Sequence, residues 1–147
     1  MELSKLMVDF KTAWIDFPGC EGLSFELANL SRTELQALRK KCVETKFDRK
    51  TRQPYEDLNE EKFIKEFSKA TIRNWKGFKL KYLEGLMVVD ISAQDPETEL
   101  DFSASNAELL ISNSTEFDTW VNEVIFDLSN FRSEPKGNSM AKTGEVA

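Results

Sequence analysis

The feature that most constrains the fold is an amphipathic stripe near the end of the chain. Its apolar residues recur at i, i+3, i+4, i+7, i+8, i+11 and i+14, and they are Phe117, Trp120, Val121, Val124, Ile125, Leu128 and Phe131. This spacing predicts an α-helix of about four turns with one apolar side. Ser114 or Thr115 can cap its first turn. Phe126 falls off the stripe, so it is expected either to pack on a neighbouring element or to be exposed as a contact.

A shorter helix is predicted in the first third of the chain. Residues Ser31–Glu34 have the pattern of a capping box, and Leu30 and Leu35 have the spacing of a hydrophobic staple. These signals predict a helix that begins there and runs to about Thr45. The charged segment that follows, residues 46–55, is interpreted as a loop.

Another helix is predicted to begin near Asn59, because two glutamates follow in its first turn, where the helix dipole favours acids. Its apolar stripe consists of Phe63, Ile64, Phe67, Thr71 and Trp75. We interpret this stripe as core packing and expect Gly77 to end the helix. Ser103 or Ser105 can cap a further short helix.

Alternating apolar and polar residues predict two β-hairpins. The first covers about residues 12–17 and 23–28, joined across a Pro-Gly turn, and the second covers about residues 78–82 and 86–90. The sequence therefore predicts an α+β fold that is predominantly helical. In this fold an N-terminal β-hairpin is followed by about four helices, with a small second hairpin among them.

The chain has the length of a single domain. With 147 residues it can bury one core, and residues 1–132 are expected to form one globular domain. Residues 133–147 hold little apolar content and are expected to be a flexible C-terminal tail. No apolar run is long enough to span a membrane, and the first ten residues lack the pattern of a signal peptide.

Charge is divided unevenly along the chain. The basic residues between positions 31 and 52 are Arg32, Arg39, Lys40, Lys41, Lys46, Arg49, Lys50 and Arg52. Residues 82–131 contain no Lys or Arg, and their acids are Glu84, Asp90, Asp95, Glu97, Glu99, Asp101, Glu108, Glu116, Asp118, Glu123 and Asp127. A stretch of one sign repels nucleic acid and attracts a basic partner. The alternative is that the basic and acidic segments face each other within the fold.

The residue inventory argues against catalysis. The chain has no histidine, which removes the commonest general base and most transition-metal sites. It also lacks the glycine-rich phosphate loops and the hydrolase motifs, so we expect no enzyme activity, no catalytic residue and no cofactor. Cys20 and Cys42 form no CxxC pair and are expected to be reduced, structural thiols.

Two charged segments have alternative interpretations. The acids Asp95, Glu97, Glu99 and Asp101 could bind calcium, dock a basic partner or form a solvated loop. The segment lacks the glycine of a calcium-binding loop, so no metal site is predicted. The basic segment 39–52 could contact phosphate, but the net charge of -6 disfavours nucleic-acid binding, and it is better read as a solvated helix face and loop.

A series of motifs in the second half resembles a known family. The motifs are WKGF at residues 75–78, FSASNAELL at 102–110, FDTWV at 117–121 and LSNFR at 128–132. In this order they resemble the tail assembly chaperones of long-tailed, siphovirus-type phages, and residues 12–45 fit the same family more loosely. The segment 85–100 and the basic segment 46–52 have no counterpart in that pattern.

The resemblance implies a protein that binds the phage tape measure protein and keeps it soluble while the tail tube assembles. It implies action in the host cytoplasm and absence from the mature virion. The tail tube protein and a frameshifted longer form of the same chain are further partners that it suggests, and it leaves a homo-oligomer open. No nucleic-acid or membrane partner is expected.

A small domain could shield an amphipathic client helix in an aromatic groove bordered by acids. We expect such a groove near the last helix, and the predicted partner-binding residues are Trp120, Val124, Phe126, Phe131, Asp95, Glu97 and Glu99. The alternatives are a structural tail or head–tail joining component of the virion, or another soluble protein-binding adaptor.

Overall fold

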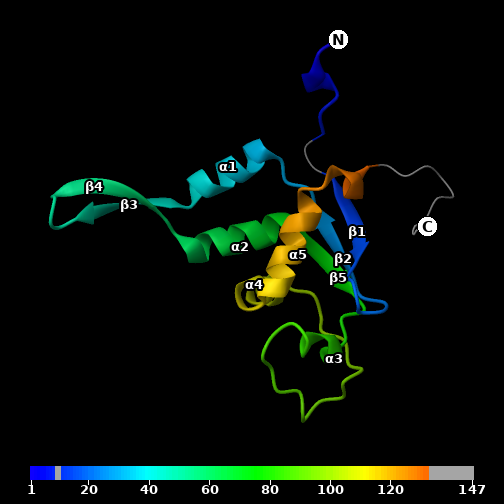
Figure 1. Cartoon of the computed structure of the whole chain (residues 1–147). Coiled ribbons are helices and arrows are strands. Elements are labelled where there is room, and N and C mark those ends of the chain that lie inside the picture. The colour runs from blue at the N-terminus through cyan, green and yellow to red at the C-terminus, as the bar shows by residue number, and fades with distance from the viewer. Residues whose placement is uncertain (9–10, 133–147) are drawn as a thin grey trace.

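The computed structural model of the chain describes residues 1–8 and 11–132 (Figure 1). The strands are β1 (Thr12–Asp16), β2 (Ser24–Ala28), β3 (Val43–Asp48), β4 (Gln53–Leu58) and β5 (Ile72–Lys76). The helices are α1 (Arg32–Lys41), α2 (Glu60–Thr71), α3 (Leu80–Leu83), α4 (Ala104–Asn113) and α5 (Thr115–Ile125). Two short 3-10 turns are η1 (Leu3–Lys5) and η2 (Leu128–Phe131).

The predicted fold class was wrong in its balance and its layout. Of the described residues, 42% are helical and 22% lie in strands or bridges, which is an α+β fold but not a predominantly helical one. Five strands form two separate sheets, one of three strands and one of two. The body of the protein consists of the three-stranded sheet with α2, α4 and α5 packed together beside it (Figure 1).

The three-stranded sheet has the order β1-β2-β5, and both pairings are antiparallel. Its first two strands are the expected N-terminal hairpin, with Ile15 opposite Phe25. The third strand was not predicted, because we expected the second helix to continue to Gly77. Instead α2 ends at Thr71, and the chain enters the sheet at the next residue.

A β-bulge explains why β5 has a helix-like spacing. Phe25 pairs with Trp75, whereas Leu27 pairs with Ile72, and the register shifts between Glu26 and Leu27. Two positions along β2 therefore correspond to three positions along β5. The extra residue brings Ile72 and Trp75 to the same face of the strand, and both are buried. The predicted helical stripe had included Thr71 and Trp75, but Thr71 is the last residue of α2 and Trp75 lies in β5.

The predicted second hairpin at residues 78–82 and 86–90 is absent from the described structure. Gly77 has a φ of 71°, and a Cβ built on it would lie 2.1 Å from the carbonyl oxygen of Gly22. Only glycine fits this close approach, which takes the chain out of the sheet. Phe78 then enters the core, and the short helix α3 replaces the first expected strand.

The charged segment 46–55 is not a loop. It belongs to a two-stranded antiparallel hairpin, β3–β4, in which Lys46 lies opposite Tyr55 and Phe47 lies opposite Pro54. The hairpin is inserted between α1 and α2 and projects away from the body (Figure 1). α1 accordingly ends at Lys41, several residues before the predicted boundary at Thr45.

An aromatic core fills the body. Phe25 on the central strand is fully buried, and its ring centroid lies 5.0 to 6.0 Å from those of Phe17, Trp75, Phe78, Phe117 and Trp120. These are the separations at which aromatic rings attract each other in tilted or edge-to-face arrangements. The order β1-β2-β5 places Phe25 on the central strand, where this one side chain contacts rings from both β5 and α5.

Most of the amphipathic stripe predicted for the last helix is confirmed as part of the core, but Leu128 is exposed. Its buried residues in α5 are Phe117, Val121, Val124 and Ile125. The helix is shorter than expected, because it ends at Ile125 and the 3-10 turn η2 follows. The side chain of Ser114 caps α5 by accepting from the amide of Phe117 at 3.2 Å, and Ser103 rather than Ser105 caps α4.

The predicted tail, residues 133–147, lies outside the described residues. Among those that the structure describes, no helix is long and apolar enough to cross a membrane. Cys20 and Cys42 are both free thiols, as expected, and Cys42 is fully buried.

Candidate partner-binding site

The best candidate binding site is a groove of about 440 Å³ between four helices. α2 supplies one apolar wall through Phe63, Ile64 and Phe67, and the end of α4 supplies Ile111. Phe67 and Ile111 are buried, whereas Phe63 and Ile64 are half-buried and remain accessible from the groove. The buried Phe67 and Ile111 therefore form a floor that continues the core of the protein. The half-buried Phe63 and Ile64 form an apolar wall that a partner can contact.

The aromatic wall belongs to the stripe that the sequence analysis had assigned to core packing. The rings of Phe63 and Phe67 lie 5.7 Å apart, so they form a continuous surface along α2. The hydrophobic staple residue Leu35 also lines the groove, from α1. The periodicity located these side chains correctly, but it could not show that α1 covers α2 only in part and leaves one edge accessible.

Charges of opposite sign border the groove. The guanidinium of Arg39 on α1 lies 5.0 Å from the ring centroid of Phe63, a cation–π contact. Glu60 lies at the start of α2 and Asp118 in the first turn of α5. A partner helix with an apolar stripe and charges of both signs beside it would match this distribution.

Asp118 is the charged group most affected by burial here. Desolvation raises the pKa of its carboxyl, and a hydrogen bond from the side-chain amide of Asn122 at 3.2 Å opposes that rise in part. Among the described residues it forms no ion pair within 4.0 Å. A lysine or arginine of a partner placed in the groove would supply the missing counter-charge.

A second cleft, of about 380 Å³, lies on the other side of α5. Its apolar walls are Phe17, Pro18 and Trp120, and the ring centroids of Phe17 and Trp120 lie 4.8 Å apart. Glu116 and Glu123 stand at its rim. This cleft has the composition expected from the sequence, an aromatic surface bordered by acids near the last helix.

The predicted aromatic and aliphatic site residues do not form one surface. Trp120 is half-buried and lines the second cleft. Val124 and Phe131 are buried members of the core, whereas Phe126 is 42% exposed at the C-terminal end of α5. Phe126 is therefore exposed, which was one of its two expected outcomes.

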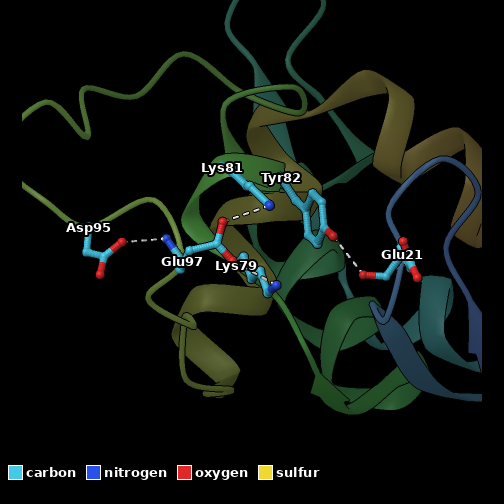
Figure 2. Close-up of polar contacts among 6 residues, drawn as sticks. All are labelled: Glu21, Lys79, Lys81, Tyr82, Asp95 and Glu97. Carbon is cyan, nitrogen blue, oxygen red and sulfur yellow. Dashed lines mark hydrogen bonds and ion pairs between the residues drawn. The ribbon is translucent and has the colours of Figure 1, made fainter.

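The three predicted acids lie in the irregular segment between α3 and α4. Figure 2 shows two of them, Asp95 and Glu97. Glu97 bridges two lysines, at 2.8 Å from Lys79 and 2.7 Å from Lys81, and these contacts lower the pKa of Glu97 to about 2. Asp95 accepts a hydrogen bond from the amide of Glu97 at 2.9 Å, and Glu99 forms an isolated β-bridge with Lys79.

The acidic segment is thus attached to the body by its own contacts. The hydroxyl of Tyr82 on α3 donates to the carbonyl oxygen of Glu21 at 2.7 Å, which joins the same region to the β1–β2 turn (Figure 2). Within the described chain, no three His, Cys, Asp or Glu side chains are grouped as metal ligands would be. The carboxylate of Glu97 serves internal structure, and the segment as a whole remains exposed.

Comparison with other proteins assigns no family to the chain. No protein-family model matches the sequence, and no match is found among curated proteins or solved structures. The groove, the cleft and the sequence motifs are therefore the features of the chain that bear on its function.

Proposed function

We propose that this protein is a phage tail assembly chaperone that binds an apolar helical stripe of the tape measure protein and keeps it soluble during tail tube assembly. The observation that carries the proposal is the groove between α1, α2, α4 and α5, with its accessible wall of Phe63 and Ile64. The order of the WKGF, FSASNAELL, FDTWV and LSNFR motifs supports the same function.

The groove suits a helix better than an extended peptide. Its walls are helices, and an extended strand would need an exposed sheet edge to satisfy its backbone groups. Side chains at i, i+3, i+4 and i+7 of an amphipathic helix can enter such a groove while the backbone hydrogen bonds of the client stay within its own helix. The tape measure protein, as the resemblance describes it, is long, helical and rich in apolar stripes.

This function places the protein in the host cytoplasm during assembly and outside the finished virion. The alternative, a structural tail or head–tail joining component, would remain associated with assembled tails. Immunoblotting of purified particles against lysate separates the two. A chaperone is present in the lysate and absent from the particles, whereas a structural component is present in both.

The direct test is co-expression with the long helical protein encoded near this gene. Ile64→Glu places a charge in the groove, and we expect it to lower the soluble fraction of the client at least fivefold. Leu109→Glu is the matched control, because Leu109 is 54% exposed on α4 and does not line the groove. Equal client solubility with both variants would contradict the proposal, provided that both give the circular dichroism of the unaltered protein.

A further inference from the structure

The β3–β4 hairpin, residues 43–58, is a projecting arm without a core of its own. None of its residues is buried, and Phe47 is 61% exposed. Figure 1 shows the arm extending beyond the ends of α1 and α2, at the side of the molecule opposite to β1. A two-stranded hairpin is only marginally stable in water. An apolar side chain held at this distance from the body is available to a partner.

The tip of the arm is strongly basic. Its turn, residues 49–52, contains Arg49, Lys50 and Arg52 and no acid. Arg52 adopts a φ of 59°, a conformation in which glycine or asparagine is the usual residue. Arginine therefore occupies a position in the turn whose left-handed backbone conformation disfavours its side chain. Lys46, further from the tip, is already paired with Asp57 at 2.9 Å.

The cleft on the outer side of α5 is complementary to this arm. The half-buried ring of Trp120 and the exposed ring of Pro18 offer apolar surface to one incoming ring, and the exposed Glu116 and Glu123 line the same cleft. Neither glutamate forms an ion pair within 4.0 Å among residues 1–8 and 11–132. The two glutamates of the cleft are thus without an ion-pair partner in the described chain, and the basic residues of the arm's turn could pair with them.

The basic and acidic segments do not neutralise each other within one molecule. The ion pairs of the described residues join Lys41 to Glu66, Lys46 to Asp57, and Lys79 and Lys81 to Glu97. None of them connects residues 31–52 with residues 82–131. The arm also extends away from α5 and from the end of β1, the elements that supply the cleft residues (Figure 1). A contact between the two must therefore come from a second copy of the chain.

We propose that the arm of one copy docks into the α5 cleft of the next copy, with Phe47 packed on Trp120 and Pro18 and the basic turn against Glu116 and Glu123. Each copy then offers one arm and one cleft, so the contact is head-to-tail and can extend beyond a dimer. This inference is independent of the client groove, which lies on the other side of α5.

Sedimentation velocity over a concentration series tests the proposal with the full chain. The unaltered protein should show a sedimentation coefficient that rises with concentration and falls at high salt, because the rim contacts are exposed charge pairs. Phe47→Ala should weaken the association at least tenfold. Tyr55→Ala is its matched control, because Tyr55 is 48% exposed on the opposite face of the same arm and should leave association unchanged.

The cleft is tested by Glu116→Lys with Glu123→Lys, which should also give a monomer. Glu61→Lys with Glu84→Lys is the control for this change. It alters net charge equally, and Glu61 lies in the first turn of α2 as Glu116 does in α5. Circular dichroism confirms folding, and the milder variant Glu116→Gln with Glu123→Gln repeats the test if the lysine variant unfolds.

Mixing the two defective proteins gives the sharpest outcome. The cleft variant retains an intact arm and the arm variant retains an intact cleft, so the mixture should form a 1:1 heterodimer that does not grow with concentration. A mixture that stays monomeric, or an unaltered protein that is monomeric at every concentration, overturns the proposal. So does an arm variant that associates normally but no longer holds the client, because the arm would then be a client-binding element.

Discussion

The two hairpins of this protein have the same secondary structure and opposite environments. In the hairpin β1–β2, four of the five residues of β2 are buried, and Phe25 contacts rings from several other elements. In the hairpin β3–β4, both strands are exposed on both faces, and the strands contact mainly each other. The first hairpin is stabilised by the core that covers it, whereas the second is stabilised mainly by its own cross-strand contacts.

The first hairpin therefore maintains the fold, whereas the second is available for binding. Substitutions in the first hairpin should change the stability of the whole domain. Substitutions in the second should change association while the body stays folded. The arm therefore carries apolar and basic side chains that have no role in the core.

The largest expected effect is on the core hub. Phe25→Ala should lower the free energy of unfolding by about 3–5 kcal/mol, because it removes a fully buried ring from the centre of the aromatic cluster. Phe47→Ala makes the same chemical change in the arm and should alter stability by no more than about 0.5 kcal/mol. Urea denaturation followed by tryptophan fluorescence measures both. Similar losses for the two variants would show that the arm belongs to the folding unit.

The next effect concerns the close approach of two loops in the body. Gly77→Ala should cost at least about 2 kcal/mol, because the left-handed backbone disfavours any side chain and the new Cβ would collide with the carbonyl of Gly22. Gly19→Ala is the matched control, since Gly19 has a φ of 83° but no heavy atom within 4 Å of a built Cβ. It should show only the conformational cost, about 1–2 kcal/mol. Equal denaturation midpoints would contradict the contact between the two turns.

Local sequence signals predicted those parts of the fold that depend on neighbours in the chain. The capping box at Ser31 is present, with Glu34 donating its amide to the Ser31 hydroxyl at 3.1 Å and accepting the Ser31 amide at 2.8 Å. The first hairpin and the buried stripe of α5 also follow from short-range periodicity. Each of these elements displays its own pattern in consecutive residues.

The failures involve partners that are distant in sequence. The strand β5 was mistaken for helix because Trp75 follows Thr71 by four residues, a helical spacing, whereas Trp75 lies in a strand that pairs with the distant β2. The hairpin β3–β4 has exposed residues on both faces, so it shows no apolar alternation and was read as a loop. For the site, periodicity found Phe63 and Trp120 but could not show which sides of α2 and α5 stay uncovered, because that depends on how the helices pack.

A smaller effect should be confined to the arm. Arg52→Gly removes the strain of a left-handed arginine and should stabilise the turn by up to about 1 kcal/mol, since the greater freedom of glycine in the unfolded chain offsets part of the gain. Amide hydrogen exchange in the arm should slow. This includes the main-chain amide at position 52, which donates to the main-chain carbonyl oxygen of Asp48 at 2.8 Å. Thr51→Gly, with no positive φ to relieve, should accelerate exchange in the same turn.

The same pair of variants examines whether the arm is coupled to the body. Because the arm shares no buried contact with the core, the global denaturation midpoint should stay unchanged in both. A midpoint that moves in parallel with the exchange rates would mean that the arm and the body unfold as one unit. The free energy assigned to the arm would then belong to the whole domain.

The smallest expected effect is on the acidic segment that is attached to the body. The pKa of Glu97 is lowered from 4.5 to about 2 by Lys79 and Lys81, so its contribution to stability is present above pH 4.5 and is lost as the pH falls towards 2 (Figure 2). Glu97→Gln should therefore flatten the decline of the thermal midpoint between pH 4.5 and 2. Glu99→Gln is the control, because it also removes one negative charge, two residues further along the chain. The Glu99 carboxylate forms no ion pair in the described chain, so this variant should keep the decline of the thermal midpoint. If the thermal midpoints of the two variants fall alike with pH, the ion pairs of Glu97 do not hold the acidic segment to the body. The acids of the segment would then be available to a partner, as the basic residues of the arm are.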